Sequence, residues 1–225
     1  MVVVCCVCVL YGEGLIKGFN KIIFMTYPKD WQEAATFIKS KFNKKTPKIM
    51  IICGSGLGPL ADNLENKTRI DYKDIPNYPS TTVQGHKGEL VVGDLNGTSV
   101  VCALGRFHYY EGNPMDVVAF PVRVAYYLGI ELLIVTNAAG GLRDKKNGGF
   151  DVGNVMQITD HVAFPCMTGN NPLRGPNIDI GPRFVPMDNA YNQNLIKKCD
   201  EIIKTLKFQE HFKKGIYCMV SGNSH

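Results

Sequence analysis

The sequence predicts an α/β fold in which helices flank a central mixed, largely parallel β-sheet. Short apolar runs at residues 49–53, 131–136 and 215–220 are typical of strands that are buried on both faces. Segments with the apolar spacing of helices lie between these runs, and two of the runs lead into turns of small residues. This alternation favours a sheet with ligand sites at the ends of its strands.

One main domain accounts for most of the chain. The 225 residues are 45% hydrophobic and 20% charged, which suits a single sizeable core. A net charge of +5 is modest and suits attraction of a small anion. The sequence has no basic tract of the kind that binds nucleic acid, so we expect no nucleic-acid partner. Three of the eight cysteines lie together near the N-terminus, and the other five have no CxxC or Cys/His metal spacing, so we expect reduced thiols in a cytoplasmic protein without a metal.

Residues 1–24 are predicted to be an atypical hydrophobic extension, and residues 25–225 the domain itself. The apolar run at 1–10 lacks a basic start and a small-residue cleavage site, so it makes a poor signal peptide. It is also too short to span a membrane, and we expect no membrane partner. Met25 is an alternative start, because an ordinary cytosolic sequence follows it.

The first half of the domain contains five predicted elements. Asp30 is a suitable cap for an amphipathic helix that ends before Pro47. The strand at 49–53 follows, and a short helix with apolar residues at 57, 60 and 64 comes next. Two extended runs, 89–93 and 98–102, flank the Asp94–Gly97 segment, which is a hairpin signal.

The second half repeats the alternation of helix and strand. A buried stripe predicts a helix over 115–128 despite Pro121, and strands follow at 131–136 and 154–159. The segment between Pro165 and Pro186 is rich in Gly, Pro and Asn, and a loop of this length is usually functional or an interface. A last helix near 195–206 precedes the strand at 215–220.

The turn at residues 54–58 reads Gly-Ser-Gly-Leu-Gly and is the first candidate site. A strand, a glycine turn and a helix start form a general anion site, since backbone N–H groups converge there. The motif is neither GxGxxG nor a P-loop, so a plain tight turn remains the alternative. Ser55 is the side chain best placed to touch a ligand.

Residues 104–112 concentrate more chemistry than any other stretch. Arg106, His108 and Tyr110 lie between two glycines, directly after the predicted strand at 98–102. Such a strand-to-loop boundary is where α/β proteins commonly place ligand chemistry. The turn at 137–141 ends another predicted strand and offers backbone N–H groups to the same ligand, whereas His86 lies in a glycine-flanked loop and is by itself more typical of a solvated histidine.

Several motifs together resemble the trimeric class of purine nucleoside phosphorylases, in the same order along the chain from about Trp31 to Gly222. The motifs are Ile52-Cys-Gly-Ser-Gly-Leu-Gly58, Gly85-His86, Gly105-Arg-Phe-His-Tyr-Tyr-Glu-Gly112, Phe120-Pro-Val-Arg123, Val135-Thr-Asn-Ala-Ala-Gly-Gly-Leu142, Asn171-Pro-Leu-Arg-Gly-Pro-Asn177 and Arg183-Phe184. Family members cleave purine nucleosides with orthophosphate and release the base and a pentose 1-phosphate. The resemblance thus implies a pentosyltransferase of purine salvage, with phosphate as co-substrate and no other cofactor.

The resemblance also implies roles for individual residues. Phosphate binding falls to the residues of the glycine turn, the 104–112 loop and the 137–141 turn: Ser55, Arg106, His108 and the backbone N–H of Ala138, with His86 beside them to gate or assist. His86, Arg106 and His108 are the expected catalytic residues. Tyr110 resembles the residue that binds ribose. Phe184 resembles an aromatic residue that covers the sugar in the site of a neighbouring subunit, which implies a homotrimer.

The resemblance stops at the base-binding half of the site. The family's aromatic and glutamate that hold the base follow the strand at 215–220, whereas this chain reads Gly222-Asn-Ser-His225 at that point. We therefore expect the base-binding residues beyond residue 225 and a C-terminal part missing from the domain. Two alternatives stay open: a truncated variant that binds phosphate or partner subunits without turnover, and a sister enzyme of the methylthioadenosine phosphorylase type.

Overall fold

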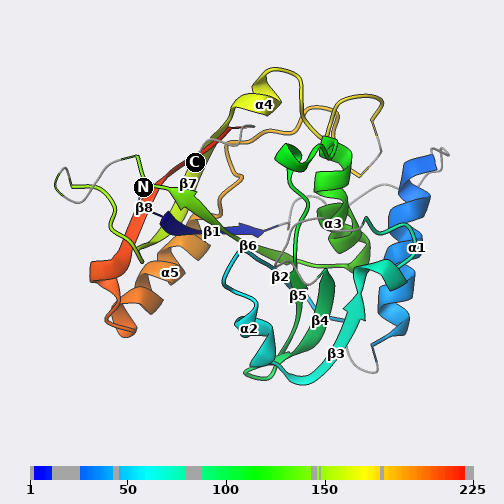
Figure 1. Cartoon of the computed structure of the whole chain (residues 1–225), viewed down its shortest axis with the longest axis horizontal. Helices are drawn as coiled ribbons and strands as arrows, with labels where there is room; N and C mark the ends of the chain where they lie inside the picture. Colours follow the sequence, from blue (N-terminus) through cyan, green and yellow to red (C-terminus); the bar gives the residue numbers. More distant parts are fainter. Residues whose placement is uncertain are drawn as a thin grey trace.

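A computed structural model shows one eight-stranded sheet flanked by helices (Figure 1). It describes residues 3–11, 26–42, 46–79, 88–142, 146, 148–177 and 180–220. The strand order is β3-β4-β5-β2-β6-β1-β7-β8. The strands are β1 (Val3–Tyr11), β2 (Ile49–Cys53), β3 (Glu65–Asp71), β4 (Glu89–Leu95), β5 (Thr98–Leu104), β6 (Leu132–Gly140), β7 (Val155–Ala163) and β8 (Phe212–Met219).

Among the described helices, three have 13 to 15 residues and two have four. They are α1 (Thr26–Ser40), α2 (Pro59–Asp62), α3 (Met115–Leu128), α4 (Phe164–Met167) and α5 (Gln193–Thr205), with 3-10 turns η1 (Tyr72–Asp74), η2 (Tyr109–Glu111) and η4 (Gln209–His211). Helix α1 begins at Thr26 instead of at Asp30, so Asp30 lies inside the helix and the predicted cap is wrong. The predicted α/β class with a mixed, largely parallel sheet is confirmed: β5, β2 and β6 run parallel, as do β7 and β8.

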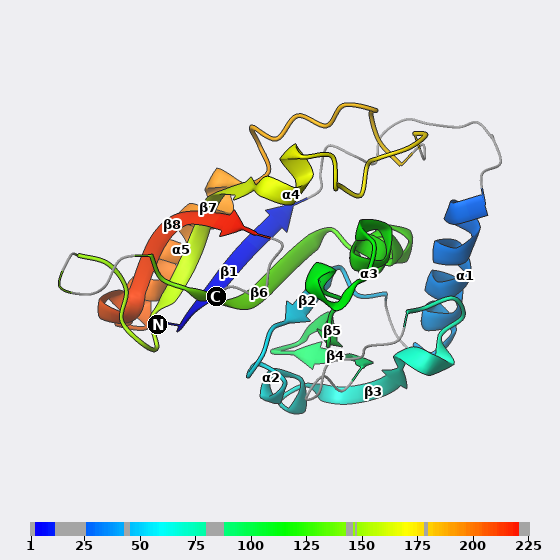
Figure 2. The ribbon, with the colours of Figure 1, turned by 45° about the horizontal axis from the view of Figure 1, so that its top comes forward.

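The main core lies between the sheet and the helix pair α1 and α3, which pack side by side (Figures 1 and 2). Trp31 and Ile38 of α1 are almost fully buried against Val124 and Leu128 of α3. A second apolar cluster on the opposite face joins Cys53 and Cys102 to the short helix α2. These two layers fix β2 and β5, the strands that end at the predicted phosphate site.

The predicted hairpin is confirmed. β4 and β5 pair antiparallel from Glu89 with Leu104 to Leu95 with Thr98. Asn96 and Gly97 turn the chain with φ of 47° and 77°, and such positive angles are what an Asn-Gly hairpin turn requires. The hairpin places the end of β5, and so the loop that follows Leu104, beside the end of β2.

The structure differs from the sequence prediction at two neighbouring strands, β6 and β1. β6 continues through the small residues 137–140, which the sequence predicted as a turn. The reason is a partner remote in sequence: β1 pairs antiparallel with β6 over its whole length and parallel with β7. The division at residue 24 stays a prediction, but residues 3–11 are part of the same sheet as the domain.

Candidate active site

The glycine turn after β2 touches the end of β6. Gly54 donates its backbone N–H to Thr136 Oγ1 at 2.7 Å, and Thr136 Oγ1 in turn donates to the carbonyl of Ile52 at 3.0 Å. A Cβ at position 54 would lie 2.6 Å from the Thr136 carbonyl oxygen and 3.0 Å from Arg106 Nη1. Only glycine therefore allows the turn, β6 and Arg106 to approach so closely.

Thr136 links the Gly54 turn to β6, and the sequence alone did not predict this part of the site. Its side chain is 5% exposed, and its hydroxyl joins the end of β2 to β6. A threonine near the end of an apolar strand gives little signal in a sequence, because β-branched residues are common in strands. Its role becomes visible only once β2 and β6 are known to be neighbours.

Arg106 follows β5 and reaches across the end of β2 towards β6. Its Nη1 lies 3.4 Å from the Thr136 carbonyl oxygen, and the side chain is partly buried. Burial lowers the pKa of the guanidinium below its usual range, and the nearby phenols of Tyr110 and Tyr217 oppose that shift. A guanidinium away from bulk water, with donors arranged in a rigid fork, is well suited to hold a phosphate.

His108 is held in one orientation by Glu111. Glu111 Oε2 lies 2.8 Å from His108 Nδ1 and also 2.8 Å from the backbone nitrogen of His108, whose N–H donates to it. Because a carboxylate only accepts hydrogen bonds, a neutral ring in this contact carries its proton on Nδ1. Burial lowers the pKa of His108; Glu111 opposes this shift and Arg106 adds to it. The net shift favours the neutral ring, in which Nε2 carries the lone pair that can accept the proton of a hydrogen phosphate.

Glu111 contributes both to the local turn and to the state of His108. Its side chain closes the η2 turn, where Gly112 follows with φ of 86°. The same carboxylate sets the tautomer of His108, a function that carboxylates often have beside active-site histidines. The signal available in the sequence is the spacing of three residues between His108 and Glu111, which is also the spacing of an ordinary capping box.

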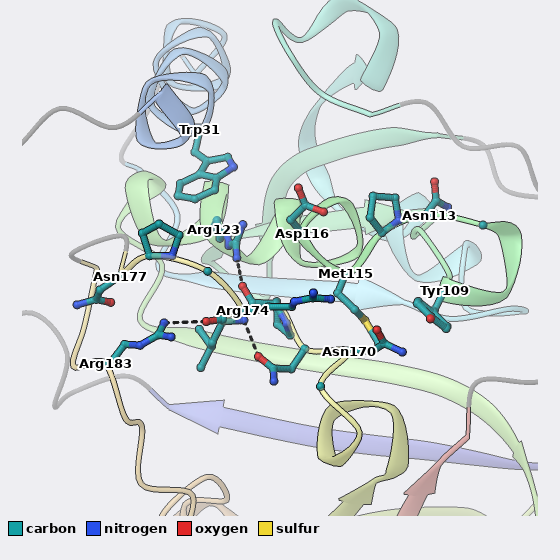
Figure 3. Close-up of a pocket in the computed structure, with 18 of the residues that line it drawn as sticks. Trp31, Tyr109, Asn113, Met115, Asp116, Arg123, Asn170, Arg174, Asn177 and Arg183 are labelled. Carbon is teal, nitrogen blue, oxygen red and sulfur yellow. Dashed lines mark hydrogen bonds between the residues drawn. The ribbon is translucent and has the colours of Figure 1, made fainter.

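Tyr110 stacks on His108, with ring centroids 4.7 Å apart and an angle of 24° between the planes. Its side chain is 48% exposed and faces a cavity of about 910 Å³. Trp31, Arg123 and the loop around residues 169–177 line the far side of this cavity (Figure 3). Arg123 stacks on Trp31 and donates to the carbonyl of Pro172, so it fastens this loop to helices α1 and α3.

The backbone of Ala138 faces the same side as Arg106. In a strand, the N–H and C=O groups of alternate residues point to the same neighbour. The carbonyl of Thr136 points towards Arg106 on the β2 side, so the N–H of Ala138 points there too. Pairing of β2 with β6 ends at Val135, which leaves this N–H group beyond the end of β2.

The structure thus brings together the Gly54 turn, Arg106, His108, Tyr110 and the end of β6. Ser55 follows Gly54 directly and is exposed. His86 lies outside the described residues. Phe184 is 87% exposed on the irregular segment after α4, and the roles given to these residues stay predictions.

Three further features of the described residues concern metal-binding groups, membrane-spanning helices and the charge near Arg106. Within residues that the structure describes, no group of three or more His, Cys, Asp or Glu side chains is placed to hold a metal ion. Over the same residues, no helix has the length and apolar character needed to cross a membrane. Arg106 is partly buried and lies beside the end of β6, so its positive charge and the nearby N–H groups suit a small oxyanion.

The chain is similar to known proteins of one family. The sequence profile of the family described as "Phosphorylase superfamily" matches residues 48–225. Purine nucleoside phosphorylase 1 of Bacillus subtilis is 49% identical over 195 residues, which are 86% of this chain and 68% of that protein. The purine nucleoside phosphorylase of Rattus norvegicus is 46% identical over 195 residues, 86% of this chain and 66% of that protein.

Solved structures show the same likeness. A purine nucleoside phosphorylase in complex with ribose-1-phosphate superposes with a TM-score of 0.82 at 39% identity, over 90% of this chain and 73% of that one. The Schistosoma mansoni enzyme in complex with inosine gives a TM-score of 0.80 at 39% identity, over 88% and 68%. The chain therefore spans about two thirds of the length of the relatives that it matches.

Proposed function

Because the chain belongs to the phosphorylase superfamily, we propose that it is a purine-nucleoside phosphorylase, which cleaves the N-glycosidic bond of purine nucleosides with orthophosphate. The products are the free base and ribose 1-phosphate or its deoxy form. The observation that carries this proposal is the close approach of Gly54 and Arg106 to the end of β6. The relatives named above are purine nucleoside phosphorylases, which supports purines as the bases.

The chemistry of the site suits phosphorolysis. Loss of the base gives the sugar oxocarbenium character, as in the hydrolysis of O-glycosides. A phosphate held below the anomeric carbon both stabilises that positive charge and attacks the carbon. The attack forms a C–O bond as the C–N bond breaks, and the electron pair of that bond leaves with the base.

Arg106 and His108 divide the binding of phosphate between them. Arg106 supplies charged donors for two phosphate oxygens, whereas His108 Nε2 accepts the hydroxyl proton of hydrogen phosphate. Fixing the nucleophile in this way supplies much of the rate, since positioning converts a bimolecular encounter into a reaction within one complex. Phosphate and nucleoside are the only small molecules this reaction requires; no metal and no organic cofactor takes part in it.

We further propose a homotrimer in the cytoplasm. Phe184 is 87% exposed, and Met187 on the same segment and Phe164 of α4 are more than half exposed, which suits contact with another subunit. In this assembly Phe184 covers the ribose in the neighbouring subunit's site. Cys53 and Cys102 are free and buried, as is usual for thiols in a reducing compartment. Molecular-mass measurement tests the assembly, and a strict monomer would remove the role of Phe184.

A coupled assay tests the activity. Purified protein is incubated with inosine and phosphate, and released hypoxanthine is oxidised in a second, colour-forming step. We expect release of base that depends on phosphate and disappears in an Arg106→Gln variant. Binding of phosphate without any release of base would instead support the alternative of a phosphate-binding chain without turnover. The absence of both activities would overturn the proposed function.

A further inference from the structure

The segment that joins the two halves of the sheet lies outside the part of the chain that matches the family. β1 comprises residues Val3–Tyr11, whereas the family match begins at residue 48. β1 separates β6 from β7, and these two strands do not pair with each other. Without β1, two strand edges would face each other across a gap of roughly 9.5 Å, the width of one strand with its hydrogen bonds on both sides.

The sequence of β1 suits this central position. It reads VVCCVCVLY and contains no charged residue, as is typical of a strand that lies inside a sheet. All of its residues have partners on β6, from Val3 with Gly140 to Tyr11 with Leu132. Cys5, Cys6 and Val7 also have partners on β7. Over Cys5–Val7, β1 therefore has a paired strand on each side and no exposed strand edge.

The register of β1 determines which backbone groups of residues 137–140 pair with β1 and which face the proposed phosphate site. Cys6 is opposite Asn137, and Val4 is opposite Ala139. The backbone groups of Asn137 and Ala139 point towards β1, since those of Thr136 and Ala138 point to the other side. β1 therefore pairs the alternate residues of this stretch and leaves the N–H of Ala138 directed at the anion site.

We propose that the gap between β6 and β7 is a binding slot for one extended apolar strand, and that residues 3–11 of this chain occupy it and thereby hold residues 137–140 in the phosphate-binding conformation. The inference rests on the proposed function for its link to phosphate. Its mode is strand addition, in which backbone hydrogen bonds supply most of the affinity. Small residues such as Ala138, Ala139 and Gly140 do not by themselves favour an extended strand, so the partner imposes the conformation.

The first test compares the full chain with a variant that lacks residues 1–24. Backbone hydrogen exchange is measured at single-residue resolution, together with the affinity for inorganic phosphate. In the full chain we expect slow exchange at Asn137 and Ala139. In the shortened variant we expect these two amides to exchange fast and phosphate to bind roughly 10- to 100-fold more weakly, because the N–H of Ala138 is no longer fixed. A synthetic peptide of residues 2–12 should restore both.

A matched pair of proline variants covers the case in which the shortened variant does not fold. By the same alternation, the N–H of Cys6 points at β6, whereas that of Val9 points away from it. The pairing of β1 with β7 ends at Val7, so the N–H of Val9 is not used by β7 either. Cys6→Pro removes a ladder hydrogen bond and should speed exchange at Asn137 and weaken phosphate binding. Val9→Pro should have much smaller effects on both.

The outcomes separate this inference from the proposed function. If the shortened variant and Cys6→Pro keep slow exchange at Asn137 and Ala139 and bind phosphate as the full chain does, residues 3–11 are not the occupant and the inference is overturned. If the full chain binds no phosphate, the proposed function fails. The exchange pattern at Asn137 and Ala139 then still decides whether β1 fills the slot.

Discussion

The geometry of the site depends on the absence of a side chain at Gly54. The turn at Gly54 approaches the carbonyl of Thr136 and the guanidinium of Arg106 so closely that a methyl group has no room. Gly58 in the same turn has open space around its Cβ position and no positive φ angle. The two glycines therefore form a natural pair of test and control.

We predict that Gly54→Ala weakens phosphate binding by roughly 10- to 100-fold, because the new methyl group displaces β6 or Arg106 by several tenths of an ångström or more. Gly58→Ala should bind phosphate as the unchanged chain does. Isothermal titration with inorganic phosphate measures both. Equal affinities for the two variants would show that the close approach at Gly54 is not part of the site.

His108 provides a second test at the scale of single residues. Burial lowers its pKa, whereas the carboxylate of Glu111 raises it. We predict that Glu111→Gln lowers the pKa of His108 further, since the amide keeps the hydrogen bond but removes the charge. An NMR titration of the His108 ring protons measures this shift. An unchanged or higher pKa in the variant would contradict the assigned contact.

The lowered pKa of His108 also predicts how stability depends on pH. The unfolded chain binds a proton at His108 near pH 6.5, whereas the folded chain binds it only at lower pH. The contribution of His108 to stability is therefore present above pH 6.5 and is lost as the pH falls towards the folded pKa. Urea unfolding between pH 5 and 7 should show a smaller loss of stability in His108→Gln than in the unchanged chain.

Among the elements, helices α1 and α3 each contribute four buried residues to the main core. Ile38 is 0% exposed and packs in the cluster that includes Val124 and Leu128 of α3. We predict that Ile38→Ala lowers the free energy of unfolding by about 2–5 kcal/mol, through lost burial and the cavity left behind. Ile202→Ala on α5, where the side chain is 56% exposed, should change it by less than about 0.5 kcal/mol. Chemical denaturation measures both, and a similar small effect at the two positions would contradict the packing of α1.

The elements also show which parts of a fold are visible in the sequence. The hairpin of β4 and β5 was predictable because its turn chemistry is local: Asn96 and Gly97 adopt the positive φ angles themselves. The extent of β6 was not predictable, because residues 137–140 become a strand through pairing with β1, a segment more than a hundred residues away. The start of α1 was misplaced because Asp30 is a suitable cap by type but lies one turn inside the helix.

At the scale of the whole molecule, the site is assembled from strands that lie far apart in sequence. β2, β5 and β6 run parallel side by side, so the segments that follow Cys53 and Leu104 meet the end of β6 at one edge of the sheet. The sequence predicted the ligand-binding ends of these strands from their alternation with helices. It did not reveal Thr136 and Glu111 as parts of the site, because their roles depend on neighbours rather than on residue type.

Phosphate binding by Arg106 is the central claim, and one titration tests it most directly. Inorganic phosphate is titrated into the full chain, into Arg106→Gln, and into Arg174→Gln as a control, because Arg174 lines the cavity beyond Tyr110. We predict one phosphate site in the unchanged chain and in Arg174→Gln. In Arg106→Gln we predict binding that is roughly 10- to 100-fold weaker, as expected for loss of a charged hydrogen-bond donor. Equal binding by Arg106→Gln and the unchanged chain, or no binding by either, would contradict the assignment of this site to phosphate.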